Sequence, residues 1–252
     1  MALLPGSSRP SARRFAAACL VLALVAGRTA RAQHGLLVDD PAWRLESSAD
    51  GIALYSGSVR EAGVVPLKAV MSIPGTIDEV ALVLVDIPRR REWISNFDES
   101  VLLERTNDYE QTEYLRVFVP WPAQNRTAVI RARVAVSDDL SRAVIAAQSV
   151  DSHLADRLPK LVRAQIHAST FQMTQVGNHV EVVALVFIDP CGSIPKWIVN
   201  HFSRRAARAT LVGLRRQVAR KLYSPAQLAA MHRRIQGYRA FRDREGAVPW
   251  FQ

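Results

Sequence analysis

Cysteine is scarce in this sequence, which contains only Cys19 and Cys191 among 252 residues. Cys19 lies inside an apolar N-terminal segment that we expect to be removed, so the mature chain would retain one thiol. An intramolecular disulfide would then be excluded, and stability has to come from the burial of apolar side chains. Residues 33–252 are numerous enough to build one domain with such a core.

Motifs for catalysis and metal binding are also missing. The sequence has no glycine-rich phosphate loop, no GxSxG elbow and no HxxxH or CxxC pair, and its six histidines lack ligand spacing. We therefore predict no catalytic residue, no metal and no cofactor, and interpret a lone histidine such as His201 as structural. In an enzyme, side chains such as Glu113, Tyr114, Arg126 or His201 would have to meet in one active site. Their spacing in the sequence gives no reason to expect this.

The N-terminus has the three parts of a signal peptide. Several arginines precede a 12-residue apolar run, Phe15–Ala26, and Ala30 and Ala32 supply small residues at a cleavage site. A membrane span needs roughly 20 apolar residues, which makes an anchor the weaker interpretation. No cysteine follows the run where a lipid anchor would need one. We predict a signal peptide over residues 1–32 and a protein that is periplasmic or secreted.

The positive charge of the chain is concentrated in this segment. Cleavage after Ala32 would remove five arginines and no acidic residue, and would lower the formal net charge from +10 to +5. A charge of this size does not indicate a nucleic-acid partner, and we expect a monomer. Two basic stretches, Arg89–Arg91 and one face of a long C-terminal helix, suit transient contact with an anionic membrane surface, but a solvated surface explains them equally well.

Short runs of alternating apolar and polar residues between positions 51 and 188 predict an antiparallel sheet. In Pro66–Ile73, for example, every second residue is apolar, so that one face of the strand is dry and the other is wet. The predicted strands are 52–59, 66–73, 100–106, 112–119, 128–136, 143–150, 161–168, 171–176 and 179–188.

Helical periodicity appears between the second and third strands and again near the C-terminus. Thr76 caps the first helix, and a short second one covers Pro88–Ile94. A long helix starts near Pro195, and a last one follows Ser224-Pro225. The chain is thus predicted to be α+β. The apolar stripe predicted for the long helix comprises Ile198, Phe202, Ala206, Ala209 and Gly213.

Six short motifs follow one another along the chain. They are Asp50-Gly51-Ile52 with Tyr55, Lys68–Met71, Asp86-Ile87 with Glu92-Trp93, Pro120-Trp121-Pro122 with Asn125-Arg126, Val162-Arg163-Ala164, and Asp189–Gly192 with Ile194–Asn200. In this order they resemble the landmarks of START (steroidogenic-acute-regulatory-related lipid-transfer) domains, from about Trp43 to Leu222. On this basis residues 33–222 are a START-like lipid-binding domain and residues 223–252 a C-terminal helical extension.

The resemblance implies a helix-grip fold of the START/Bet v 1-like kind, in which a curved antiparallel sheet wraps around the long C-terminal helix. It implies an extracytoplasmic protein that binds or transfers a lipid held in a closed hydrophobic cavity, without a cofactor. The side chains predicted to face the ligand are Leu67, Ala69, Met71, Trp93, Glu113, Leu115, Ile130, Ala132, Val134, Val182, Ala184, Val186, Trp197, Ile198 and Phe202.

Two positions depart from the family pattern. Thr127 stands where the family usually has an aspartate after Asn125-Arg126, so an ion pair is lost. Ala132 stands where sterol carriers place a base opposite an acid, for which Glu113 would be the acidic member. A sterol ligand is therefore not favoured.

Apolar faces alone do not distinguish a cavity from a packed core. Small residues on the dry faces, such as Ala69, Ala132 and Ala184, favour a cavity because a tightly filled core uses larger side chains. The main alternative is an enzyme on the same scaffold, such as a cyclase, an aromatase or a hydrolase. Another is an envelope adaptor that binds protein through its arginine-rich face and the tail Pro249–Phe251.

Overall fold

One large sheet dominates the part of the chain that the computed structural model describes, residues 43–57, 64–119, 123–153 and 161–245. Its strands follow the order β1-β2-β3-β10-β9-β7-β6-β5-β4, with antiparallel neighbours throughout, and β8 pairs in parallel with β6. The strands are β1 Arg44–Ala49, β2 Ile52–Ser56, β3 Leu67–Pro74, β4 Phe97–Arg105, β5 Glu110–Val117, β6 Arg126–Val136, β7 Arg142–Ser149, β8 Val162–Arg163, β9 Gln165–Val176 and β10 His179–Asp189.

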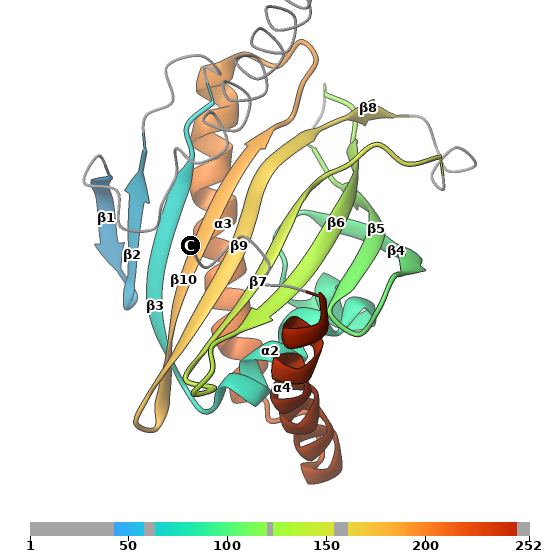
Figure 1. The fold of residues 1–252 in the computed structure, drawn as a ribbon. Coiled ribbons are helices and arrows are strands. Elements are labelled where there is room, and N and C mark those ends of the chain that lie inside the picture. The colour runs from blue at the N-terminus through green and yellow to red at the C-terminus, as the bar shows by residue number, and fades with distance from the viewer. Residues whose placement is uncertain (1–42, 58–63, 120–122, 154–160, 246–252) are drawn as a thin grey trace, which may run out of the picture. The chain divides into compact units, whose positions relative to one another are not determined.

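Four helices accompany the sheet: α2 (Ile77–Val85), the 3-10 helix η1 (Ile87–Glu92), α3 (Lys196–Ala219) and α4 (Pro225–Glu245). The sheet curves around α3, which packs against β2, β3 and α2 (Figure 1). This is the α+β arrangement that the alternating strands and the long C-terminal helix predict. None of the described helices has the length and apolar composition needed to span a membrane.

The predicted start of α2 is confirmed by its cap. The hydroxyl of Thr76 accepts a hydrogen bond from the backbone N–H of Glu79 at 3.3 Å, and the Glu79 carboxylate accepts from the N–H of Thr76 at 3.1 Å. This reciprocal capping box satisfies two of the helix's free N–H groups. The helix then buries Ile77, Val80 and Leu84 against the sheet.

Three expectations about the elements were wrong. Strand β1 was not predicted, because Arg44–Ala49 has little apolar alternation. Residues 165–176 form one continuous strand rather than the ends of two. The short helix after α2 is of the 3-10 type and ends at Glu92.

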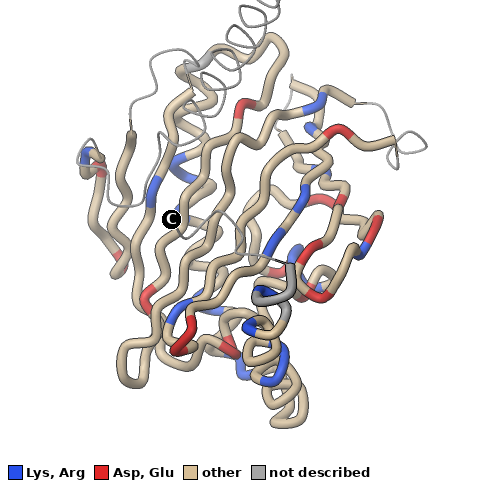
Figure 2. Tube along the Cα trace, in the orientation of Figure 1, with Lys and Arg blue, Asp and Glu red and all other residues tan. Residues whose placement is uncertain are grey.

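Charged residues lie mainly on the edge strands and the helices, and the central strands carry few (Figure 2). Strand β9 contains no Lys, Arg, Asp or Glu, and β10 contains only Glu181 and Asp189. Such strands are suited to an apolar interior on one side of the sheet.

Candidate functional site

The register of the sheet brings the predicted strand residues onto one face. Leu67, Ala69 and Met71 on β3 lie opposite Val186, Ala184 and Val182 on β10. Directly paired residues of an antiparallel sheet point to the same side. The same row continues across the sheet through Phe171, Ile145 and Val134, and through Ser169, Ala147 and Ala132. It ends where Ile130 pairs with Glu113 and where Ala128 pairs with Leu115. All eleven predicted strand residues therefore share what we call the inner face.

The inner face is buried at both ends and less so between them. One apolar cluster contains Ala69, Met71 and Val182 together with residues of α2 and α3. A second, separate cluster contains Ala128, Ile130 and Ile166, with Leu115, Ala147 and Ile188 packed against it. Inner-face residues such as Ala132, Ser169 and Val186 belong to neither cluster and are only half-buried. The apolar side chains thus do not merge into one fully buried core.

A small cavity lies between α2, α4 and the sheet. Its volume is about 20 Å³, which is room for about one water molecule. Val134 is the predicted ligand-facing residue among its lining residues, which also include Tyr109, Met231 and Ile235. This cavity is too small for a lipid. It lies where α4 covers one end of the inner face.

A buried ion pair forms the main polar feature of the inner face. Arg90 on η1 donates from both terminal nitrogens to the carboxylate of Glu113, with Nη2 3.2 Å from Oε1. The side chain of Glu113 is fully buried and that of Arg90 is 12% exposed. Ser100 Oγ and Gln111 Nε2 donate to the same carboxylate at 3.0 and 2.5 Å. The acid therefore has a base, supplied by a helix rather than by position 132.

This pair corrects one expectation for the basic stretch Arg89–Arg91. Arg90 does not face a membrane surface, because its charge is used inside the protein. Burial raises the pKa of Glu113, but the Arg90 charge and the hydrogen bonds to the carboxylate outweigh burial and hold that pKa below its usual value. The Glu113 carboxylate therefore stays charged beside Arg90, and the pair is a polar contact within apolar surroundings.

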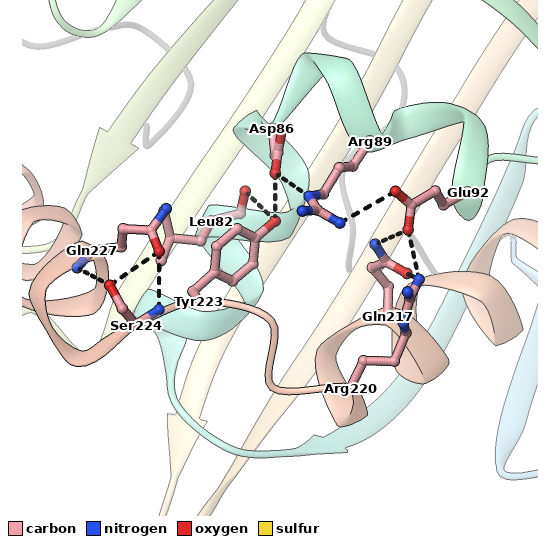
Figure 3. Close-up of polar contacts among 9 residues, drawn as sticks. All are labelled: Leu82, Asp86, Arg89, Glu92, Gln217, Arg220, Tyr223, Ser224 and Gln227. Atoms are coloured by element: carbon pink, nitrogen blue, oxygen red, sulfur yellow. Dashed lines mark hydrogen bonds and ion pairs between the residues drawn. The ribbon is translucent and has the colours of Figure 1, made fainter.

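A polar network holds η1 from its other side (Figure 3). Asp86 accepts a hydrogen bond from Tyr223 Oη at 2.9 Å, and Glu92 accepts from Gln217 Nε2 at 3.0 Å and from Arg220 Nη1 at 2.5 Å. Both ends of η1 are thereby tied to the end of α3 and to the segment that follows it. The network comprises Leu82, Asp86, Arg89, Glu92, Gln217, Arg220 and Tyr223, and next to it Ser224 and Gln227 bond to each other at the start of α4.

Trp93, the predicted ligand-facing residue that follows η1, lies against α3. The backbone of Trp93 approaches Gly213 so closely that a Cβ at position 213 would lie 2.2 Å from the Trp93 carbonyl oxygen. Ser95 adds a hydrogen bond from its backbone N–H to Thr210 Oγ1 at 3.1 Å. The second half of α3 is therefore in direct contact with the chain that carries Arg90 and Trp93.

The first half of α3 differs from the predicted apolar stripe. Ala209 is exposed, and the buried residues among the described side chains of the helix are Val199, Leu211, Gly213, Leu214, Gln217 and Val218. Among the predicted ligand-facing residues, Ile198 is half-buried, while Trp197 is 74% and Phe202 46% exposed. Trp197 and Phe202 are thus not enclosed by protein in this conformation.

The turn between β10 and α3 is held by Arg126. Cys191 and Gly192 have positive φ angles of 53° and 71°. The buried Arg126 donates to the carbonyl oxygens of Pro190 at 2.8 Å and of Cys191 at 3.2 Å. Arg126 thus fixes the backbone of the turn that leads into α3.

Arginines on α3 hold the edge of the sheet. Arg208 donates to the carbonyl oxygen of Ala49 and to Ser47 Oγ, both at 2.8 Å, and Arg215 donates to the carbonyl oxygen of Asp50 at 2.7 Å. Arg204 lies 3.5 Å from Glu46. Of the arginines on the predicted basic face of this helix, Arg204, Arg208 and Arg215 thus contact the sheet edge, and Arg205 and Arg216 are exposed.

Sequence comparison gives the family. A profile of the START domain matches residues 29–220. The chain is 28% identical over 180 residues to an uncharacterized protein of Pseudomonas aeruginosa. The aligned region covers 69% of this chain and 85% of that protein. It is 25% identical over 200 residues to the phosphatidylcholine transfer protein of Bos taurus, over 78% of this chain and 88% of that protein.

Solved structures share the fold. Human StAR-related lipid transfer protein 5 has a TM-score of 0.67 at 16% identity, over 82% of this chain and 99% of that one. A STAR-related lipid transfer protein from Xanthomonas axonopodis has a TM-score of 0.61 at 25% identity, over 71% of this chain and 99% of that one. These likenesses confirm the helix-grip fold, and the bovine, human and Xanthomonas relatives are all named for lipid transfer. The chain belongs to the START domain family of lipid-binding and lipid-transfer proteins.

Proposed function

We propose that this protein is an extracytoplasmic lipid carrier that holds one hydrophobic ligand in a closed cavity between the inner face and α3. The observation that carries the proposal is the half-buried apolar strip between the two buried clusters of the inner face. An acyl chain placed there would gain about 0.8 kcal/mol for each methylene removed from water. The fifteen predicted ligand-facing residues remain the proposed lining.

Phosphatidylcholine is the first ligand to test. A relative over most of the chain is named for the transfer of this lipid. Position 132 carries no base, which argues against a sterol. Arg90 and Glu113 neutralise each other, so neither offers an unpaired charge to a ligand. We propose a diacyl phospholipid, bound one to one.

Native mass spectrometry of residues 33–252 after incubation with phosphatidylcholine vesicles tests this proposal. We expect one lipid per protein monomer, and the same spectrum gives the oligomeric state. Ala132→Trp should fill the half-buried strip and abolish binding, whereas Gln172→Trp, on the opposite face of the sheet, should bind like the wild type. A wild-type protein that takes up no lipid would refute the carrier function.

We propose that membrane contact is made by the N-terminal end of α3. Its support is the exposure of Trp197 and Phe202, since aromatic rings suit the boundary between water and acyl chains. Transfer of lipid between vesicles should slow when both are replaced by Ala. Unchanged transfer would place the contact elsewhere.

Export is supported by the predicted signal peptide, which lies outside the described residues. The enzyme alternative finds no support in the named relatives, and the adaptor alternative depends on a tail that also lies outside the described residues.

A further inference from the structure

The side chain of Trp93 is 5% exposed and belongs to the larger interior cluster. Its indole Nε1 is buried, and no hydrogen-bond acceptor for it occurs among the described residues. A buried donor without an acceptor costs roughly 1–3 kcal/mol. Native structures seldom keep such a group unless something else accepts its hydrogen bond.

Trp93 directly follows η1, the 3-10 helix that carries Arg90. The N–H of Trp93 donates to the carbonyl oxygen of Arg90 at 3.2 Å. This bond fixes the backbone of Trp93 next to the residue that pairs with Glu113.

The neighbouring polar groups are already engaged. Glu113 accepts hydrogen bonds from Arg90, Ser100 and Gln111, and Arg90 is neutralised by that carboxylate. Three other buried side-chain atoms also lack a hydrogen bond, but each is either near a carboxylate or away from the inner face. Arg131 Nε and Arg204 Nε each lie 3.5 Å from a carboxylate, and Tyr114 belongs to a small cluster with Val129 away from the inner face. Among the described residues, Trp93 Nε1 is thus the interior donor left for a ligand.

We propose that the Trp93 indole N–H donates a hydrogen bond to an ester carbonyl oxygen of the bound lipid. The inference rests on the proposed carrier function and specifies its ligand as a diacyl lipid. An uncharged oxygen suits the position better than a phosphate, because Trp93 lies in an apolar cluster and the charge of Arg90, three residues before it, is already paired with Glu113.

Trp93→Phe tests the inference, because phenylalanine keeps an aromatic ring but removes the N–H. The probes are dipalmitoyl phosphatidylcholine and its dihexadecyl ether analogue, which lacks both carbonyls and keeps the headgroup. Each is offered as vesicles to the full mature chain, and the bound fraction at equilibrium is measured. We expect the variant to lose about five- to tenfold in affinity for the diacyl lipid. The loss for the ether analogue should be clearly smaller.

Trp43→Phe is the matched control, since Trp43 lies outside the proposed lining, beside the Lys68 ammonium, and it should bind both lipids like the wild type. The thermal midpoint of lipid-free Trp93→Phe should fall only by the packing that the smaller ring gives up, because no internal hydrogen bond is lost. Equal losses for both lipids, or unchanged binding of the diacyl lipid, would overturn the inference. Failure of the wild type to bind either lipid would instead refute the carrier function itself.

Discussion

The pairing of Glu113 with Arg90 makes each residue costly to change alone. Glu113→Gln would leave the Arg90 guanidinium largely buried without a countercharge, and we expect a loss of about 3 kcal/mol in the free energy of unfolding, measured in urea. The double replacement Arg90→Met with Glu113→Leu removes both charges and should restore most of that stability. A single variant as stable as the wild type would show that the pair contributes little.

The same carboxylate gives the protein a predicted sensitivity to acid. The pKa of Glu113 in the folded protein lies below its usual value of 4.5, although burial alone would raise it, because the Arg90 charge prevails. A lowered folded pKa stabilises the protein above the unfolded pKa, and this stabilisation disappears as the pH falls through the folded value. The unfolding free energy of the wild type should therefore decline more steeply below about pH 4.5 than that of Glu113→Gln. Parallel pH profiles would contradict this assignment.

Gly213 is required by the close approach of Trp93. A methyl group at position 213 would meet the backbone of Trp93, which cannot rotate away. Gly213→Ala should therefore lower the thermal midpoint despite the better helix propensity of alanine. Gly237→Ala in α4 is the matched control, because its methyl group would meet only the end of the Tyr109 side chain, and its effect should be milder. Equal effects would indicate that α3 can shift.

At the level of elements, the strands were the most predictable part. Alternation with period two fixes which residues share a face, so the inner-face residues of β3, β6 and β10 followed from the sequence. The stripe of α3 was less predictable, because alanines at 206, 207 and 209 leave the direction of the buried side ambiguous. Its buried side is defined by contacts with β2 and β3, far away in the sequence.

Polar partners were the least predictable feature. Arg89, Arg90 and Arg91 are identical in type, and only the turn of η1 decides that Arg90 points to Glu113. Similarly, nothing local in α3 indicates that Arg208 binds the carbonyl oxygen of a strand that begins 164 residues earlier, at Arg44. The sequence shows which residues are charged, whereas the partner that each charge binds depends on tertiary contacts.

The edge hairpin β1–β2 should depend on the arginines of α3. Arg208→Met keeps the length of the stem and removes the hydrogen bonds to Ala49 and Ser47. We expect faster amide hydrogen exchange in residues 44–56, with a loss of only about 1 kcal/mol in global stability. Exposed Arg205→Met is the control and should leave the exchange unchanged. Unaltered exchange in Arg208→Met would mean that the hairpin is held by the sheet alone.

For the whole molecule, we predict export followed by cleavage of the N-terminal segment after Ala32. Expressed in a Gram-negative host with its full leader, the protein should be recovered from the periplasm with Gln33 as its first residue, as determined by N-terminal sequencing. Replacing Ala30 and Ala32 by Arg should block cleavage, because signal peptidase requires small residues at these positions. Recovery of the uncut wild-type chain from the cytoplasm would refute the prediction.

The uneven burial of α3 has a mechanical consequence. Its second half is packed against Trp93 and buries Leu211, Leu214 and Val218, whereas Trp197 and Phe202 near its start are exposed. Trp197 lies 16 residues before Gly213, or about 24 Å along the axis, so a tilt of about 10° about the packed half would displace it by about 4 Å. Such a tilt would have to break the arginine contacts that hold the rest of the helix, from Arg204 and Arg208 to the edge hairpin and from Arg126 to the preceding turn.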